Sequence, residues 1–364
     1  MLVSLACASC DAPHDPAALA TVCAACGRSL SAAYDPTRLA EAFRSGSIAG
    51  RERSMWRYRE VLPVGDAPPV TLGEGLTPLL PLDRLGRILG LPRLMAKEEG
   101  TNPTGSFKAR GFAAAVTAAR DRGATRLVAP SAGNAAGALA AYAARAGLDA
   151  AVWLPADSPA PNRLETRACG AAVTEVDGTI ADAARRMKAE AGEGFDVSTL
   201  KEPYRLDGKK TMGYELFEQL GGLPDAILYP TGGGTGLLGM AKAFDELESV
   251  GLIGAARPRM IAVQARAVAP IVAAFEAGQD ESEATPDGRT IATGLQVPKA
   301  FADWWVLREI RRSDGRAVAV DDDAMLDAIR RTAAAEGLLL CPEGAALVAA
   351  LPRLADEGVL TADA

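Results

Sequence analysis

"AILYPTGGGTGLLG", residues 226–239, decides the fold that we expect for this chain. It opens on an apolar run that favours a strand, passes through Gly232, Gly233, Gly234 and Gly236, and continues with an apolar pattern typical of a helix. Backbone amides without side chains, placed at the N-terminus of a helix, form a cradle for a phosphate group. The stretch therefore predicts an α/β fold that binds a phosphate where a strand meets a helix.

The same glycines also match the dinucleotide-binding pattern G-x-G-x-x-G at Gly234, Gly236 and Gly239. That interpretation requires an acidic residue at the end of the next strand, to bind the ribose hydroxyls. The next apolar run, residues 260–265, contains Gln264 and no carboxylate. A purely structural turn is the other alternative, but the run holds more glycine than a tight turn needs. We therefore favour a phosphate that does not belong to a dinucleotide.

Short apolar runs alternate with alanine-rich segments around this stretch. The predicted strands cover residues 126–130, 150–156, 171–176, 226–231, 260–265 and 317–320. The predicted helices cover residues 106–123, 133–147, 180–192, 236–251 and 322–337, and residues 31–60 are expected to be helical and charged. Such alternation is typical of parallel sheets covered by helices, here in two lobes.

Length and charge narrow the class of protein. A chain of 364 residues is long enough for two cores and an appendage. Its net charge of −7 argues against a nucleic acid or an anionic membrane as partner, because both attract basic surfaces. The start of the chain has no basic segment of a signal peptide, and no apolar run is long enough to span a bilayer. We expect a cytoplasmic protein that binds a small molecule.

Four cysteines in the first 26 residues form two C-x-x-C pairs, Cys7 with Cys10 and Cys23 with Cys26. Two such pairs bring four thiolates to one Zn²⁺ ion, which stabilises a segment too short to build an apolar core. Four thiolates close the coordination sphere, so the ion would be structural. The alternatives are free cysteines, a redox pair, or a site in which His14 replaces one thiolate.

His14 is the only histidine of the chain, which excludes a catalytic triad or a Cys–His pair in the main body. A lysine is the better candidate for the reactive group. In "TNPTGSFKARG", residues 101–111, Lys108 follows a run of turn-forming residues and begins a helical pattern. A partly desolvated amine at that place is a competent nucleophile toward an aldehyde. The alternative is an ordinary surface lysine at the start of a helix.

A third segment, residues 131–147, places Ser131, Gly133 and Asn134 between a predicted strand and a helix. These residues could simply cap the helix, or they could hold a carboxylate and a phenolic oxygen. A phosphate, an aldehyde and a phenolate together describe pyridoxal 5′-phosphate.

The chain resembles the threonine synthases, which belong to the fold-type II pyridoxal-phosphate enzymes. The matching segments are residues 72–80, 97–111, 131–147, 203–211, 229–247, 294–305 and 336–347. They cover nearly the whole body after residue 70. The resemblance implies an α/β fold with two open parallel-sheet lobes, preceded by an N-terminal zinc ribbon.

The resemblance also implies a role for several residues toward the cofactor. Lys108 condenses with the aldehyde, Phe107 lies beside the ring, and Asn134 binds the phenolic oxygen. The phosphate is held by Gly232, Gly233, Gly234, Thr235 and Gly236. Near the pyridine nitrogen, many relatives carry Ser or Thr, whereas this chain offers Glu343 and Gly344. A carboxylate there keeps the nitrogen protonated, while a glycine leaves it without a partner.

For the reaction, the resemblance implies that O-phosphohomoserine and water give threonine and phosphate, with Lys108 as the acid and base. Ser131 belongs to the loop that holds the substrate carboxylate, while Thr179 and Arg185 match phosphate contacts of related enzymes. An exposed helix face is the alternative for Arg185. Many relatives carry Thr where this chain has Ala135, so one phosphate contact is missing.

Two other functions remain open. One is another fold-type II reaction, either dehydration of threonine or serine or a cysteate-synthase-like β-replacement. The other is a zinc-ribbon interaction protein that has lost catalysis. We expect a ribbon over residues 1–30, a large cofactor-binding lobe over 31–108 and 206–364, and a smaller mobile lobe over 109–205. Relatives are often dimers, which predicts a homodimer.

Overall fold

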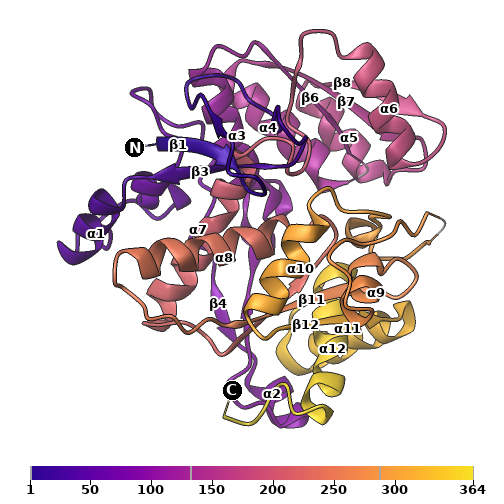
Figure 1. The fold of residues 1–364 in the computed structure, drawn as a ribbon. Helices are drawn as coiled ribbons and strands as arrows, with labels where there is room; N and C mark the ends of the chain where they lie inside the picture. Colours follow the sequence, from indigo (N-terminus) through magenta and orange to yellow (C-terminus); the bar gives the residue numbers. More distant parts are fainter. Residues whose placement is uncertain (1, 132, 287, 364) are drawn as a thin grey trace. The chain divides into compact units, whose positions relative to one another are not determined.

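The computed structural model describes residues 2–131, 133–286 and 288–363 (Figure 1). The chain divides into two compact units. The first comprises the residues up to Thr77, Glu99–Tyr214 and Lys242–Gly254, and the second comprises Pro78–Glu98, Glu215–Ala241 and the residues from Ala255 onward. The predicted division into a ribbon, a large lobe and a mobile lobe stays a prediction.

The first unit is built on a four-stranded parallel sheet in the order β8-β7-β6-β9. Its strands are β6 (Arg126–Pro130), β7 (Asp149–Pro155), β8 (Ala172–Val176) and β9 (Phe195–Asp196). The helices that begin in this unit's body are α3 (Lys108–Asp121), α4 (Asn134–Ala146), α5 (Ala160–Ala168), α6 (Ile180–Glu190) and α7 (Tyr204–Leu220). Figure 1 shows α5 and α6 beside this sheet.

Helix α3 lies inside the core of the first unit. Every residue from Ala109 to Ala119 is buried, and most of them are alanine. Because alanine adds only a methyl group, α3 packs directly against α4, and both helices contact the apolar side chains Leu127 and Val152 of the sheet in one cluster. The alanine bias of the sequence therefore reflects a tightly packed helical layer around the segment that carries Lys108.

The N-terminal residues form a small antiparallel sheet in the order β2-β1-β3. Its strands are β1 (Leu2–Cys7), β2 (Pro13–His14) and β3 (Leu30–Tyr34). The expectation that residues 31–60 are helical is therefore wrong in part. Leu30, Ala32 and Tyr34 alternate toward the buried face, which favours a strand paired with β1. The helix α1 (Pro36–Arg44) begins after Asp35, and a 3₁₀ helix follows at Met55–Val61.

The second unit is built on the parallel sheet β10-β11-β12, with a separate hairpin of β4 and β5. The strands are β10 (Ala226–Pro230), β11 (Arg259–Ala265), β12 (Arg316–Val320), β4 (Leu79–Pro81) and β5 (Met95–Lys97). The helices are α2 (Asp83–Leu89), α8 (Thr235–Ser249), α9 (Pro270–Glu276), α10 (Asp303–Arg312), α11 (Asp322–Glu336) and α12 (Pro342–Asp356). Helix α8 begins in this unit and ends in the first.

All six predicted strands and all five predicted helices are confirmed, with ends that differ by one or two residues. The prediction missed β9, α5, α7, α9, α10 and α12. Among the described residues, no helix is both long and apolar enough to cross a membrane.

A glycine sets how closely α7 approaches α3. A Cβ atom on Gly208 of α7 would lie 2.0 Å from the carbonyl oxygen of Arg110 in α3, a separation that no carbon atom tolerates. On the α3 side, a Cβ atom on Gly111 would lie 3.2 Å from the carbonyl oxygen of Arg205. The two helices therefore meet through their backbones, and this contact holds the beginning of α3 in place.

Replacing Gly208 with Ala should force these helices apart and lower the free energy of unfolding by about 2 kcal/mol or more. Gly222→Ala is the matched control, since no atom lies within 4 Å of its added Cβ. We expect the control to stay within about 0.5 kcal/mol of the unaltered protein. Denaturant unfolding of both variants measures the difference, and equal stabilities would contradict the close contact.

Candidate functional site

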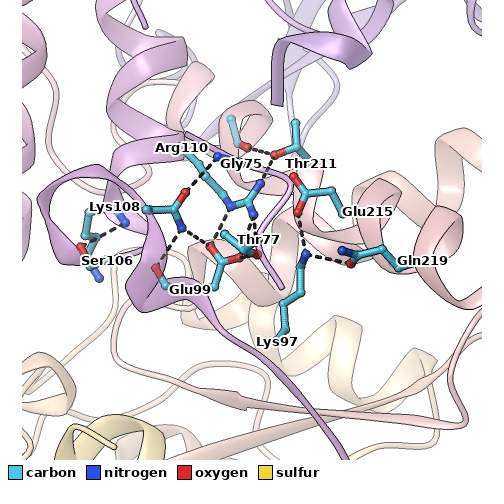
Figure 2. A network of polar contacts seen from close by, with 12 residues as sticks. Gly75, Thr77, Lys97, Glu99, Ser106, Lys108, Arg110, Thr211, Glu215 and Gln219 are labelled. Atoms are coloured by element: carbon cyan, nitrogen blue, oxygen red, sulfur yellow. Dashed lines mark hydrogen bonds and ion pairs between the residues drawn. The ribbon is translucent and has the colours of Figure 1, made fainter. Parts of the chain in front are cut away.

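The loop that leads to Lys108 is held by a buried ion pair between Glu99 and Arg110 (Figure 2). The Arg110 guanidinium donates from Nε to Glu99 Oε2 and from Nη2 to Glu99 Oε1, each at 2.7 Å. The Arg110 side chain is fully buried. A bidentate pair of this kind fixes orientation as well as distance.

Four further hydrogen bonds surround this pair. Thr77 Oγ1 donates to Glu99 Oε1 at 2.7 Å, and Asn102 Nδ2 donates to Glu99 Oε2 at 2.9 Å. Arg110 Nη1 donates to Thr211 Oγ1 at 2.9 Å. The backbone N–H of Gly75 donates to Asn102 Oδ1 at 3.0 Å. The network thus joins the segment 75–77, the loop after Glu99, helix α3 and helix α7.

Lys108 is the first residue of α3, as the sequence predicts, and Phe107 is the residue before the helix. The Lys108 amine lies over the Phe107 ring, with Nζ 3.8 Å from the ring centroid. Its backbone N–H donates to Ser106 Oγ at 3.4 Å. The side chain is half-buried, so the amine is partly desolvated and still accessible.

Thr104, four residues before Lys108, has a φ of 60°. A β-branched residue rarely adopts this left-handed conformation, which costs about 1 kcal/mol or more. Its Oγ1 atom is buried and has no hydrogen-bond partner among the described residues. The loop therefore combines backbone strain with an unsatisfied hydroxyl, a combination that is common at binding sites.

Lys209 of α7 is a second lysine at the Phe107 ring, and the sequence analysis missed it. Its Nζ lies 4.6 Å from the ring centroid, and the residue is 2 % exposed. Burial, and then the charge of Lys108, lower the pKa of Lys209 well below its usual value. Residues 203–211 attract attention only through the family resemblance, because a Lys-Lys pair in a polar helix suggests a solvated face.

Ser131 and Asn134 lie where the sequence predicts, between β6 and α4. Asn134 is the exposed first residue of α4, and Ser131 is buried. The Ser131 backbone N–H donates to the Trp153 carbonyl oxygen at 3.0 Å, which fixes the loop to the sheet. Neither residue acts as the side-chain cap of α4, whose preceding residue is Gly133. The alternative that they only cap the helix is therefore not supported.

Thr179 and Arg185 belong to the beginning of α6. Thr179 forms a capping box with Asp182, in which each side chain accepts a hydrogen bond from the other residue's backbone N–H. Arg185 pairs with Asp182, and 77 % of its side chain is exposed. Their assignment to a substrate phosphate stays a prediction, since these local contacts alone account for both side chains.

The glycine run of the second unit is packed so tightly that larger residues do not fit. A Cβ atom on Gly232 would lie 2.6 Å from the Gly294 carbonyl oxygen, and one on Gly234 would lie 2.3 Å from Val306 Cγ2. Gly234 also has a φ of 73°. Helix α8 begins at Thr235, so the bare amides precede a helix N-terminus as predicted.

Glu343 lies in the first turn of α12 and accepts a hydrogen bond from the backbone N–H of Gly294 at 2.7 Å. Gly294 thus contacts both the glycine run and Glu343, which the sequence analysis did not foresee. The motif 294–305 carried that signal, but no residue type in it pointed to a contact. One Glu343 oxygen is therefore engaged in positioning the chain at Gly294.

The four head cysteines converge. Their sulfur atoms all lie within 4.8 Å of one another, with Cys7–Cys26 at 3.4 Å, Cys10–Cys26 at 3.6 Å and Cys10–Cys23 at 3.7 Å. Thiolates at about 2.3 Å from one tetrahedral Zn²⁺ ion would lie about 3.8 Å apart, so the geometry fits such an ion. Burial raises the pKa of Cys7, but the backbone N–H groups of Cys10 and Ser9 lower it to about 7 overall. His14 is outside this cluster.

Comparison of sequences places these features in a family. The profile described as "Pyridoxal-phosphate dependent enzyme" matches residues 70–364. A threonine synthase of Methanosarcina acetivorans is 34 % identical, over 99 % of this chain and 88 % of the relative. The threonine synthase of Methanocaldococcus jannaschii is 34 % identical, over 98 % and 89 %. That of Mycobacterium tuberculosis is 36 % identical, over 83 % and 82 %.

Comparison of structures finds the same fold in proteins with other activities. A threonine deaminase from the organism abbreviated T.th. superposes with a TM-score of 0.66 at 29 % identity, covering 78 % of this chain and 88 % of the other. A maize serine racemase superposes with a TM-score of 0.67 at 25 % identity, covering 76 % and 80 %.

The ion pair below Lys108 gives a direct test. Arg110→Lys keeps the charge but loses the bidentate contact with Glu99, so we expect a loss of about 3 kcal/mol in unfolding free energy. It should also lower the fraction of protein that binds pyridoxal phosphate, measured by its visible absorbance. Arg186→Lys, in an exposed pair with Glu190, is the control and should change stability by about 0.5 kcal/mol or less. An Arg110→Lys variant with unchanged stability and absorbance would refute the role of the pair.

Proposed function

We propose that this chain, which belongs to the threonine synthase family of pyridoxal-phosphate dependent enzymes, converts O-phosphohomoserine and water into threonine and phosphate. The observation that carries this proposal is the 34 % identity to a threonine synthase over 99 % of the chain. Residues 101–111 and the glycine run, which the sequence analysis selected from chemistry alone, lie within the matched region. An enzyme that uses pyridoxal phosphate needs an amine and a phosphate cradle, and the chain offers both.

Several residues of the first unit fit the cofactor's organic part. Lys108 is the amine that would bind its aldehyde, and Phe107, which lies under the Lys108 amine, would contact its ring. Asn134 would bind its phenolic oxygen, and its position at the exposed start of α4 leaves the side-chain amide available.

In the second unit, Gly232, Gly233, Gly234, Thr235 and Gly236 would hold the cofactor phosphate. The tight contacts at Gly232 and Gly234 support this role, since a side chain at either position would collide with its surroundings. Glu343 would face the pyridine nitrogen. Its carboxylate has one oxygen bound to the Gly294 N–H and offers the other to the ring.

Lys108 would also move protons during the reaction. Bound pyridoxal phosphate supplies an electron sink that stabilises negative charge on the substrate carbons. A primary amine beside those carbons can accept a proton at one and donate it at another, and the only histidine of the chain lies in the cysteine head. The network around Arg110 would keep this amine in place by fixing the first turn of α3.

For the substrate, we propose that Ser131 helps to hold the carboxylate and that Thr179 and Arg185 bind the phosphate. Arg185 could turn from Asp182 to a phosphate at small cost, because their ion pair is exposed. Ala135 supplies no hydroxyl at the next position of α4, so phosphate binding would need another donor.

The second candidate function is dehydration of threonine or serine. It is favoured by one observation, the structural similarity to a threonine deaminase at 29 % identity. That similarity covers 78 % of the chain, whereas the relative named threonine synthase covers 99 %. A shared fold supports several reactions of this cofactor, so the more extensive sequence match decides our choice.

We further propose that Cys7, Cys10, Cys23 and Cys26 bind a structural Zn²⁺ ion, that the protein acts in the cytoplasm and that it forms a homodimer. The sulfur distances of 3.4 to 3.7 Å support the metal site. Four protein ligands leave no open position, so the ion would stabilise the head and take no part in the reaction.

Activity measurements test the main proposal. The purified holoenzyme should release equal amounts of phosphate and threonine from O-phosphohomoserine, and Lys108→Ala should abolish both. Borohydride treatment of the unaltered holoenzyme should fix the pyridoxyl group on Lys108, as found by peptide mass spectrometry. Ammonia and 2-oxobutanoate from threonine, without threonine formation, would instead establish the dehydratase.

The zinc proposal is tested by Cys23→Ser. We expect this variant to lose Zn²⁺ and to unfold at a lower temperature, because the ion replaces an apolar core in the head. Its cofactor absorbance should remain. Cys169→Ser, outside the cluster, is the control and should keep its zinc. A folded Cys23→Ser variant that retains zinc but loses the cofactor would contradict the structural role.

A further inference from the structure

Lys209 is buried without the partner that a buried lysine normally has. The next residue, Lys210, is also buried and pairs with Glu246 at 2.7 Å and with Asp207 at 3.4 Å. In contrast, Lys209 makes no hydrogen bond or ion pair with another described residue, and its amine lies only against the Phe107 ring. Burying an amine in this way costs free energy unless the amine has a function.

The groups that face Lys209 leave this region with an excess of basic side chains. They are Lys108 on α3, Arg205 on α7 and Glu202 just before α7. Glu202 accepts hydrogen bonds from the backbone N–H groups of Tyr204 and Arg205, and burial raises its pKa to about 7. Arg205 donates to the Val197 carbonyl oxygen at 2.8 Å and lies over the Phe112 ring. Three basic groups therefore face one carboxylate, which already has other partners.

Such an excess has two stable solutions. Either one amine stays neutral, or an anion enters and balances the charge. In the ligand-free protein, the lowered pKa of Lys209 favours the neutral amine. An anion that came within hydrogen-bond distance would favour the ammonium form and supply its missing partner.

The backbone makes room for the lysine stem. The Cβ of a residue larger than glycine at position 111 would lie 3.1 Å from Lys209 Cε. Gly208 allows the two helices to approach, and Gly111 leaves space for the stem, so the amine reaches the Phe107 ring beside Lys108. The buried amine is thus directed toward the predicted reactive lysine.

We propose that Lys209 binds the phosphoryl group of the substrate and accepts one proton from the solvent as this anion enters. The inference rests on the proposed function, and it supplies the phosphate donor that Ala135 lacks. Lysine suits a phosphoryl group because its ammonium is a compact charge with three donors. No bond of the substrate breaks in this step, since one proton moves from water to an amine.

The experiment measures binding of inorganic phosphate and of homoserine to the holoenzyme by calorimetry at about pH 8, where phosphate is a dianion. Each titration is repeated in two buffers with different ionisation enthalpies, which counts the protons taken up. The variants are Lys209→Met, which keeps the stem without the amine, and Lys209→Arg, which keeps a permanent charge. Lys188→Met, an exposed lysine of α6, is the matched control.

We expect the unaltered holoenzyme to take up about one proton per phosphate bound. Lys209→Met should weaken phosphate binding about tenfold or more and abolish proton uptake, since a charge-assisted hydrogen bond is lost. Lys209→Arg should bind phosphate without taking up a proton. Homoserine, which has the carboxylate but no phosphoryl group, should bind the Lys209→Met variant as it binds the unaltered protein. Thermal unfolding and cofactor absorbance should confirm that the variants are folded.

Unchanged phosphate affinity in Lys209→Met would overturn the proposal, as would phosphate binding by the unaltered protein without proton uptake. An equal loss of phosphate and homoserine binding would also overturn it, because Lys209 would then bind the carboxylate. These outcomes are independent of the reaction. If the holoenzyme made no threonine but bound phosphate through Lys209, the proposed function would fall and the anion site would stand.

Discussion

The candidate site of the first unit depends on the buried pair of Glu99 and Arg110. An α-helix turns by about 100° per residue, so Arg110 and Lys108 lie on nearly opposite sides of the first turn of α3. The pair can therefore fix the helix from one side while the Lys108 amine stays available on the other. Breaking one partner would leave a buried charge without compensation, which makes the network stable only when it is complete.

The same arrangement explains why α3 and α7 carry glycine where they meet. Gly208 brings the α7 backbone against Arg110, and Thr211, one turn later, accepts a hydrogen bond from the Arg110 guanidinium. Lys209 lies between these two contacts along the chain. The close approach that stabilises the Arg110 network thus also determines where the Lys209 amine lies, and packing and charge placement have a common cause.

The sequence predicted the central strands, the phosphate-type glycine run and the position of Lys108 because each has a local signal. Alternating apolar runs report a sheet, and four glycines before a helix report bare amides. It did not predict Lys209, Glu99 with Arg110, or Gly294, because their roles depend on contacts between segments far apart in the chain. Strand β3 was missed since its pairing with β1 overrides a composition that suits a helix.

Fold similarity alone leaves the reaction open, since a deaminase and a racemase share this architecture. The charges of the first unit narrow the choice. Threonine and serine carry one carboxylate, whereas a phosphorylated amino acid adds a group with a charge of about −2 at neutral pH. Lys209 and Arg205 place two basic side chains beside Lys108, with only Glu202 to oppose them. Because buried charges must be balanced, this arrangement fits the more anionic substrate better, and it favours the synthase over the dehydratase on grounds independent of sequence identity.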